Sequence, residues 1–118
     1  SILNFTGSSG TLGITSTASF GGFASDSIAS PSNQYIRCHY NQSEPYITIN
    51  VPHSSFWNPS IGTEVIFEQA SGVNISVLPS GGSVAINSAY TRTSAGQYSV
   101  LSIKKVDTNT WTLTGDVQ

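Results

Sequence analysis

Aromatic side chains in a polar loop are the clearest candidates for ligand chemistry in this sequence. The stretch His53-Ser-Ser-Phe-Trp-Asn-Pro places Phe56 and Trp57 between His53 and Asn58. An exposed aromatic ring can stack on the face of a sugar, while neighbouring amide and imidazole groups hydrogen-bond its hydroxyls. The loop is therefore a candidate sugar-binding site. The alternative, which we favour for each ring, is that the two rings plug the end of a β-sandwich.

Two further groups of residues have types suited to binding. Tyr35, Arg37 and His39 alternate along one predicted strand and so share a face. This face is either a binding surface or a subunit contact, since Tyr and Arg are enriched at interfaces. Tyr90 and Arg92 precede the last pair of strands. They can bind a carboxylate or phosphate, or pair with Glu across subunits, and we favour the structural role.

Catalytic and metal-binding patterns are weak by comparison. Glu64 and Glu68 share a strand face, but four residues along a strand span about 13 Å, beyond the ~5–9.5 Å of a glycosidase carboxylate pair. The sequence contains no Gly-x-Ser-x-Gly motif and only two His. Cys38 and His39 are adjacent and point to opposite faces of a strand, so they form no metal cluster. We expect a non-enzymatic chain without metal or cofactor.

Composition favours a single all-β domain. Of 118 residues, 33 are Ser or Thr, and only 8% are charged. The 11 Ile, 8 Val and 12 aromatic residues are strand formers, whereas good helix formers are scarce. A net charge of -2 with four cations argues against a nucleic-acid partner. No apolar run approaches the ~20 residues that span a bilayer, so we expect no membrane insertion.

Alternation of apolar and polar residues predicts seven short strands. Turn signals recur every 8–15 residues, at sites such as Gly72 and Pro79-Ser80-Gly81-Gly82. This spacing predicts an antiparallel β-sandwich, of the jelly-roll kind. The predicted strands lie at residues 35–40, 46–51, 63–69, 73–77, 84–86, 97–106 and 109–117.

The first 34 residues differ in composition from the rest. They are rich in Gly, Ser and Thr, with one weak strand expected between Thr11 and Phe20. We predict that residues 1–34 are a lead-in segment, which packs on the domain or joins a shaft. Residues 35–118 form the predicted β-sandwich domain.

The strand after Gln97 has an irregular pattern. Tyr98 and Val100 share one face, while Leu101 and Ile103 share the other. Either a β-bulge shifts the phase near Val100, or the strand is apolar on both faces. A strand covered on both faces fits an oligomer, with one face in the protomer core and the other against a neighbouring copy.

Three pieces of the second half resemble a known family. They are residues 61–69 with the Gly72 turn, the Pro-Ser-Gly-Gly turn before Val84, and the final strands ending in Asn-Thr-Trp-Thr-Leu-Thr-Gly-Asp. Together they resemble the distal domains of bacteriophage tail fibres, tailspikes and tail-needle knobs. The resemblance implies a β-sandwich that forms a homotrimer at the fibre tip and adheres to a bacterial surface glycan or protein. It carries over only scaffold positions: Gly62, Gly72, Trp111, Gly115 and Asp116.

The resemblance and the composition lead to one functional expectation. The chain is expected to be a trimeric tip domain at the distal end of a phage tail fibre, attaching the virion to a bacterial surface receptor. Two alternatives remain open: a secreted, monomeric carbohydrate-binding module, and a trimerisation cap without a ligand. The expected receptor contacts are His53, Phe56, Trp57, Asn58, Tyr35, Arg37 and His39.

Overall fold

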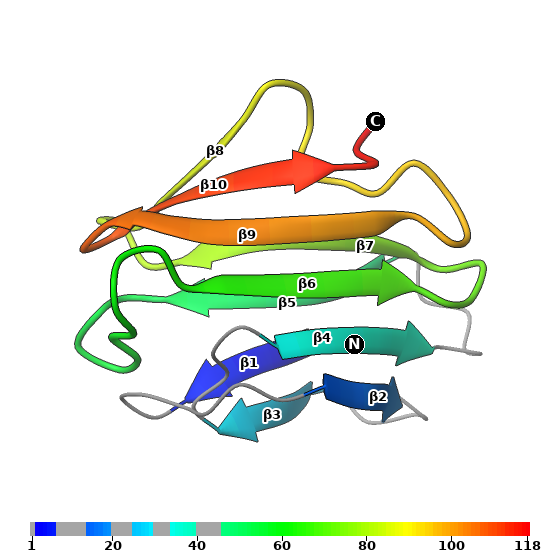
Figure 1. Cartoon of the computed structure of the whole chain (residues 1–118), viewed down its shortest axis with the longest axis horizontal. Coiled ribbons are helices and arrows are strands. Elements are labelled where there is room, and N and C mark those ends of the chain that lie inside the picture. The colour runs from blue at the N-terminus through cyan, green and yellow to red at the C-terminus, as the bar shows by residue number, and fades with distance from the viewer. Residues whose placement is uncertain (1, 7–13, 20–24, 30–33, 40–45) are drawn as a thin grey trace.

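The protein is all-β. The computed structural model describes residues 2–6, 14–19, 25–29, 34–39 and 46–118, with side chains described for 35–38 and 47–118. Within these ranges every regular element is a strand, which confirms the expectation of an all-β chain (Figure 1). The strands are β1 (Ile2–Thr6), β2 (Ile14–Ser19), β3 (Ser25–Ala29), β4 (Gln34–His39), β5 (Tyr46–Pro52), β6 (Glu64–Gln69), β7 (Asn74–Ser80), β8 (Ala85–Ser88), β9 (Val100–Asp107) and β10 (Thr110–Gly115).

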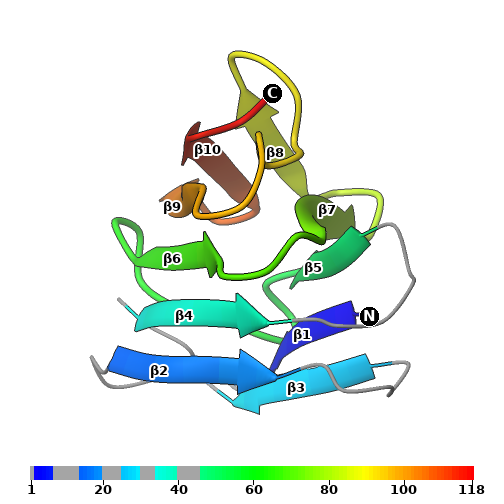
Figure 2. The ribbon, with the colours of Figure 1, turned by 90° about the vertical axis from the view of Figure 1, so that its right-hand side faces the viewer.

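The strands form two sheets that face each other (Figure 2). One has four strands in the order β3-β1-β5-β7, and the other has six in the order β2-β4-β6-β9-β10-β8. From β1 to β8 the chain passes from one sheet to the other at every step. A strand of the opposite sheet thus supplies the crossover that two parallel neighbours require.

The predicted antiparallel pairing is wrong for most of the neighbouring strands in the two sheets. Only β6–β9 and β9–β10 are antiparallel among the described pairs. The pairs β1–β3, β1–β5, β5–β7, β2–β4, β4–β6 and β8–β10 are all parallel. The physical reason is that from β1 to β8 each strand is followed by a strand of the other sheet, so consecutive strands there form no hairpin.

The first 34 residues contribute more regular structure than one weak strand. They contain β1, β2 and β3. β1 lies between β3 and β5, and β2 pairs with β4. The division of the chain at residue 34 and the link to a shaft stay predictions.

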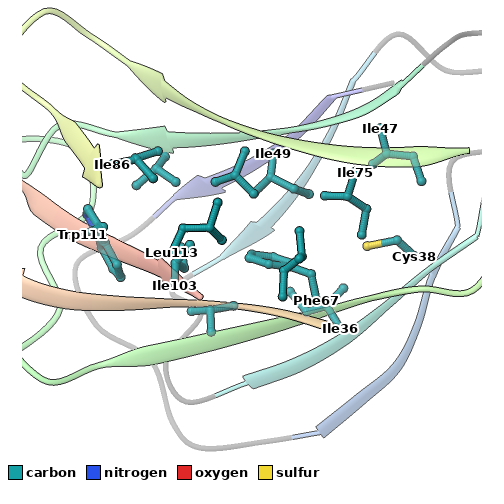
Figure 3. Packing of buried hydrophobic residues seen from close by; sticks show 14 of the residues in the cluster. Ile36, Cys38, Ile47, Ile49, Phe67, Ile75, Ile86, Ile103, Trp111 and Leu113 are labelled. Carbon is teal, nitrogen blue, oxygen red and sulfur yellow. The ribbon is translucent and has the colours of Figure 1, made fainter. Parts of the chain in front are cut away.

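One hydrophobic cluster fills the space between the sheets (Figure 3). Glu64 and Glu68 share the outer face of β6, as predicted, while Val65 and Phe67 between them are buried. The four-stranded sheet contributes Ile47, Ile49, Val51, Ile75 and Val77, and the six-stranded sheet contributes Ile36, Cys38, Val65, Phe67, Ile86, Leu101, Ile103, Trp111 and Leu113.

The irregular pattern before β9 and the bulge within β9 lie at opposite ends of the strand. Tyr98 precedes the strand with a φ of 69°, so it does not share the strand's alternation. The register shifts between Thr110 and Trp111, whose partners are Asp107 and Lys105, which leaves Val106 as the extra residue. The bulge therefore lies at Val106 and not near Val100.

Because the Cys38 thiol is buried, the free energy of unfolding changes with pH in the alkaline range. Burial is the main reason that its pKa rises from 9.0 to about 12, and the charge of Glu68 raises it further. Between these values the unfolded chain loses the thiol proton while the folded chain keeps it, so the free energy of unfolding falls as pH rises. We expect wild type to lose about 2 kcal/mol more than Cys38→Ala between about pH 8.5 and 10.5 in denaturant titrations. Equal losses would show that the thiol ionises in the folded state.

Candidate functional site

The loop from His53 to Gly62 joins β5 to β6 and is fixed by the β9–β10 turn. Asn109 accepts a hydrogen bond from the backbone N–H of Ser54 at 2.8 Å. Its amide nitrogen lies 3.1 Å from the Ser54 hydroxyl and 3.2 Å from His53 Nε2. His53 Nδ1 accepts a hydrogen bond from the Ser55 N–H at 3.1 Å. The His53 imidazole is therefore engaged in shaping the loop.

Phe56 and Trp57, which the sequence places together, have opposite roles. The Trp57 indole is 1% exposed and stacks on Trp111, with ring centroids 5.1 Å apart and planes 17° apart. Phe56 is 71% exposed. The expectation that Trp57 contacts a receptor is corrected, because its ring is inside the protein. The alternative interpretation, an aromatic plug, holds for Trp57 and not for Phe56.

Lys105 holds the second half of the same loop from inside. Its side chain is buried, and Nζ donates hydrogen bonds to Asn58 Oδ1 at 2.5 Å and to the Pro59 carbonyl at 2.6 Å. Desolvation lowers the pKa of the Lys105 ammonium. Backbone bonds to Gly62 and Thr63 complete the attachment. Asn58, an expected receptor contact, is exposed but has its amide oxygen occupied by Lys105.

Replacing Lys105 by Met tests this attachment. The variant keeps the aliphatic stem but leaves the acceptors at Asn58 and Pro59 without their donor, which costs about 1–3 kcal/mol. We expect that loss in the free energy of unfolding, measured by urea titration. Lys104→Met is the matched control, because Lys104 is exposed. A loss of equal size in both variants would contradict a role specific to Lys105.

The second predicted surface is an occupied polar cluster on the outer face of β4 and β6. The Tyr35 hydroxyl donates to Glu68 Oε1 at 2.6 Å, and Arg37 Nε donates to Glu68 Oε2 at 3.2 Å. The hydrogen bond to Glu68 is the main reason that the pKa of Tyr35 is raised. The side chain of His39 lies outside the described residues. The structure thus brings Tyr35 and Arg37 together, with Glu68 as their shared partner.

A groove beside β8 is a stronger candidate site. Its volume is about 670 Å³, and it lies between β8 and the segment that follows it. Tyr90 is 77% exposed, and Arg92 is also exposed. From the sequence we favoured a structural role for these two residues. The sequence signal for a site here was an aromatic and a cationic residue close together after a short strand. The lining residues are Val84, Ala85, Ile86, Asn87, Ser88, Tyr90, Thr91 and Arg92.

Hydrogen bonds fix the backbone on the Tyr90–Arg92 side of this groove. The Ser88 hydroxyl donates to the Thr91 carbonyl at 2.7 Å and accepts from the Tyr90 N–H at 3.3 Å. The Arg92 carbonyl accepts from the Val77 N–H at 2.9 Å, which ties the segment to β7. The groove wall is therefore held by β7 and β8 without a ligand.

A buried polar network lies behind the same segment. Ser94 and Gln69 are both fully buried. The Ser94 hydroxyl donates to Gln69 Oε1 at 2.5 Å and accepts from the Ile75 N–H at 2.7 Å. The Gln69 amide donates to the Ser71 carbonyl and to Asn74 Oδ1. Because unpaired buried polar groups are costly, this network fixes the path of the chain beyond Arg92.

The described residues contain no cluster of three or more His, Cys, Asp or Glu side chains placed to hold a metal ion. In the same ranges, no helix has the length and apolar character needed to cross a membrane. Comparison with protein-family models, with curated proteins and with solved structures found no match to this chain.

Proposed function

We propose that this chain is a non-enzymatic tip domain of a phage tail fibre, which attaches the virion to a glycan on the bacterial surface. The observation that carries the proposal is the groove of about 670 Å³ beside β8. The resemblance of about residues 55–117 to distal fibre domains supplies the biological setting.

The groove has the chemistry of a saccharide site. Asn87 provides an amide that donates and accepts hydrogen bonds, and the Ser88 and Thr91 hydroxyls, whose protons are used within the chain, can each accept one more. Tyr90 adds an exposed aromatic ring that can lie against the apolar face of a sugar. A concave surface with a few convergent polar groups is typical of ligand sites.

Assembly as a homotrimeric β-sandwich is part of the proposal. Support comes from large apolar side chains that a single copy leaves exposed, since burying apolar surface between copies favours association. Ile61 and Val106 are exposed in the β5–β6 loop and at the end of β9. Three linked copies of a weak sugar site would bind a cell surface far more firmly than one copy, through effective concentration.

Two measurements on the same preparation test the proposal. Light scattering at micromolar concentration is expected to give three times the chain mass of 12.4 kDa. A fluorescent form of the protein is expected to label whole bacterial cells, and enzymatic removal of surface polysaccharide is expected to abolish the labelling. A monomer would contradict the trimer, and labelling that survives removal of the polysaccharide would contradict the glycan receptor.

A secreted carbohydrate-binding module is the second candidate. One observation favours it: the exposed Tyr90 ring at the groove is the kind of aromatic platform on which such a module stacks a sugar. A monomer that binds soluble polysaccharide would support this candidate, whereas a trimer that labels cells supports the tail-fibre tip. A trimer that binds no cell surface would support the third possibility, a trimerisation cap.

A further inference from the structure

We propose that the groove beside β8 recognises an acidic saccharide, with the Arg92 guanidinium binding a carboxylate of the sugar. This inference rests on the proposed glycan-binding function and adds the class of glycan and the residue that selects it.

Arg92 is the cation, among the described residues, that lines the groove. Arg37 pairs with Glu68, and Lys105 is buried against Asn58 and Pro59. Arg92 is exposed at the groove, and no group in the described part of the chain accepts a hydrogen bond from its guanidinium. A planar guanidinium matches a carboxylate with two parallel hydrogen bonds.

No other side chain that lines the groove is an anion that could pair with Arg92. The other lining residues are apolar, hydroxyl or amide residues, with no carboxylate among them. A neutral sugar would leave the Arg92 charge without a partner in the groove. A sugar carboxylate would supply one, while its ring hydroxyls meet Asn87, Ser88 and Thr91.

The backbone on either side of Arg92 is fixed before a ligand arrives. The Thr91 N–H donates to the Gln118 carbonyl at 3.1 Å, and the Gln118 N–H donates to the Thr93 carbonyl at 2.9 Å. The bridge between Ser76 and Thr93 adds a second attachment to β7. Little chain ordering therefore opposes binding, which favours recognition by a preorganised site.

A second, smaller hollow extends the surface past Tyr90. It has a volume of about 190 Å³ and shares Ser88 and Tyr90 with the groove, while Leu113 and Val117 make its lining more apolar. The Tyr90 ring is therefore positioned to contact one sugar from the groove and the apolar face of the next from this hollow. We expect oligosaccharides to bind more tightly than the corresponding monosaccharides.

Matched pairs of polysaccharides test the inference on the full chain. The probes are bacterial polysaccharides that contain uronic acids, each presented beside the same preparation after chemical reduction of its carboxyl groups to alcohols. We expect reduction to weaken binding by about tenfold or more, as loss of a charge-assisted hydrogen-bonded pair predicts. Arg92→Gln should weaken binding to the acidic form equally and leave the reduced form unaffected, and Arg92→Lys should restore part of the affinity.

Lys104→Gln is the matched control, because it removes an exposed cation that does not line the groove. Its binding is expected to equal that of wild type, and thermal melts of every variant check that it is folded. Equal binding of wild type to acidic and reduced forms would overturn the inference while leaving glycan attachment standing, as would unchanged binding of Arg92→Gln. Failure of wild type to bind any saccharide would overturn both.

Discussion

Replacing Trp57 by alanine is expected to lower the free energy of unfolding by about 3–5 kcal/mol, the usual cost of removing a large buried aromatic side chain. The indole is buried and stacked on Trp111, so the variant loses the burial of one ring and one face of the other. The loop that carries Trp57 should lose its attachment to the end of the sheet as well. Urea titration followed by circular dichroism measures the effect.

Phe56→Ala is the matched control for this prediction. Phe56 is the neighbouring aromatic residue in the same loop, but its ring is exposed. Its replacement should change stability by about 0.5 kcal/mol or less. A folded Trp57→Ala variant with unchanged stability and lost cell binding would contradict the burial and return Trp57 to the receptor surface.

The faces of the strands were predictable from sequence, but their directions were not. Alternation places Val65 and Phe67 inward whether β6 runs parallel or antiparallel to β4. A turn signal likewise marks where the chain leaves one strand and not which sheet it enters next. β1 and β3 escaped prediction, and β2 was expected only as a weak strand between Thr11 and Phe20. The residues of β2 and β3 are mostly Ser, Thr and Ala and have little apolar pattern, and the partners β5 of β1 and β4 of β2 come later in the chain.

The candidate site depended on contacts that sequence cannot show. Phe56 and Trp57 are adjacent and chemically alike, and only the presence of Trp111 decides which ring is buried. The same holds for Arg37, which Glu68 engages from the next strand. Tyr90 and Arg92 could be named as binding residues, but the groove itself forms only because the chain after β8 returns to pair with β7.

Gly115→Ala is expected to be the other strongly destabilising change. Gly115 closes β10 with a φ of 111°, in the left-handed region that favours glycine. A Cβ at this position would overlap the carbonyl oxygen of Val100 and lie 3.1 Å from the Leu101 Cα, both of them backbone atoms that cannot rotate away. Backbone strain of about 1–3 kcal/mol and a similar cost of overpacking add together here.

The same carbonyl explains why this strain cannot be relieved locally. Val100 O accepts a hydrogen bond from the Asp116 N–H, and Asp116 Oδ2 accepts one from the Val100 N–H. Moving β9 and β10 apart would break both hydrogen bonds and shift Leu101 within the core. Gly72→Ala is the matched control, since a Cβ there meets nothing within 4 Å. Thermal melts should show a large drop for Gly115→Ala and little change for Gly72→Ala; equal melting temperatures would mean that β9 and β10 separate more easily than their hydrogen bonds indicate.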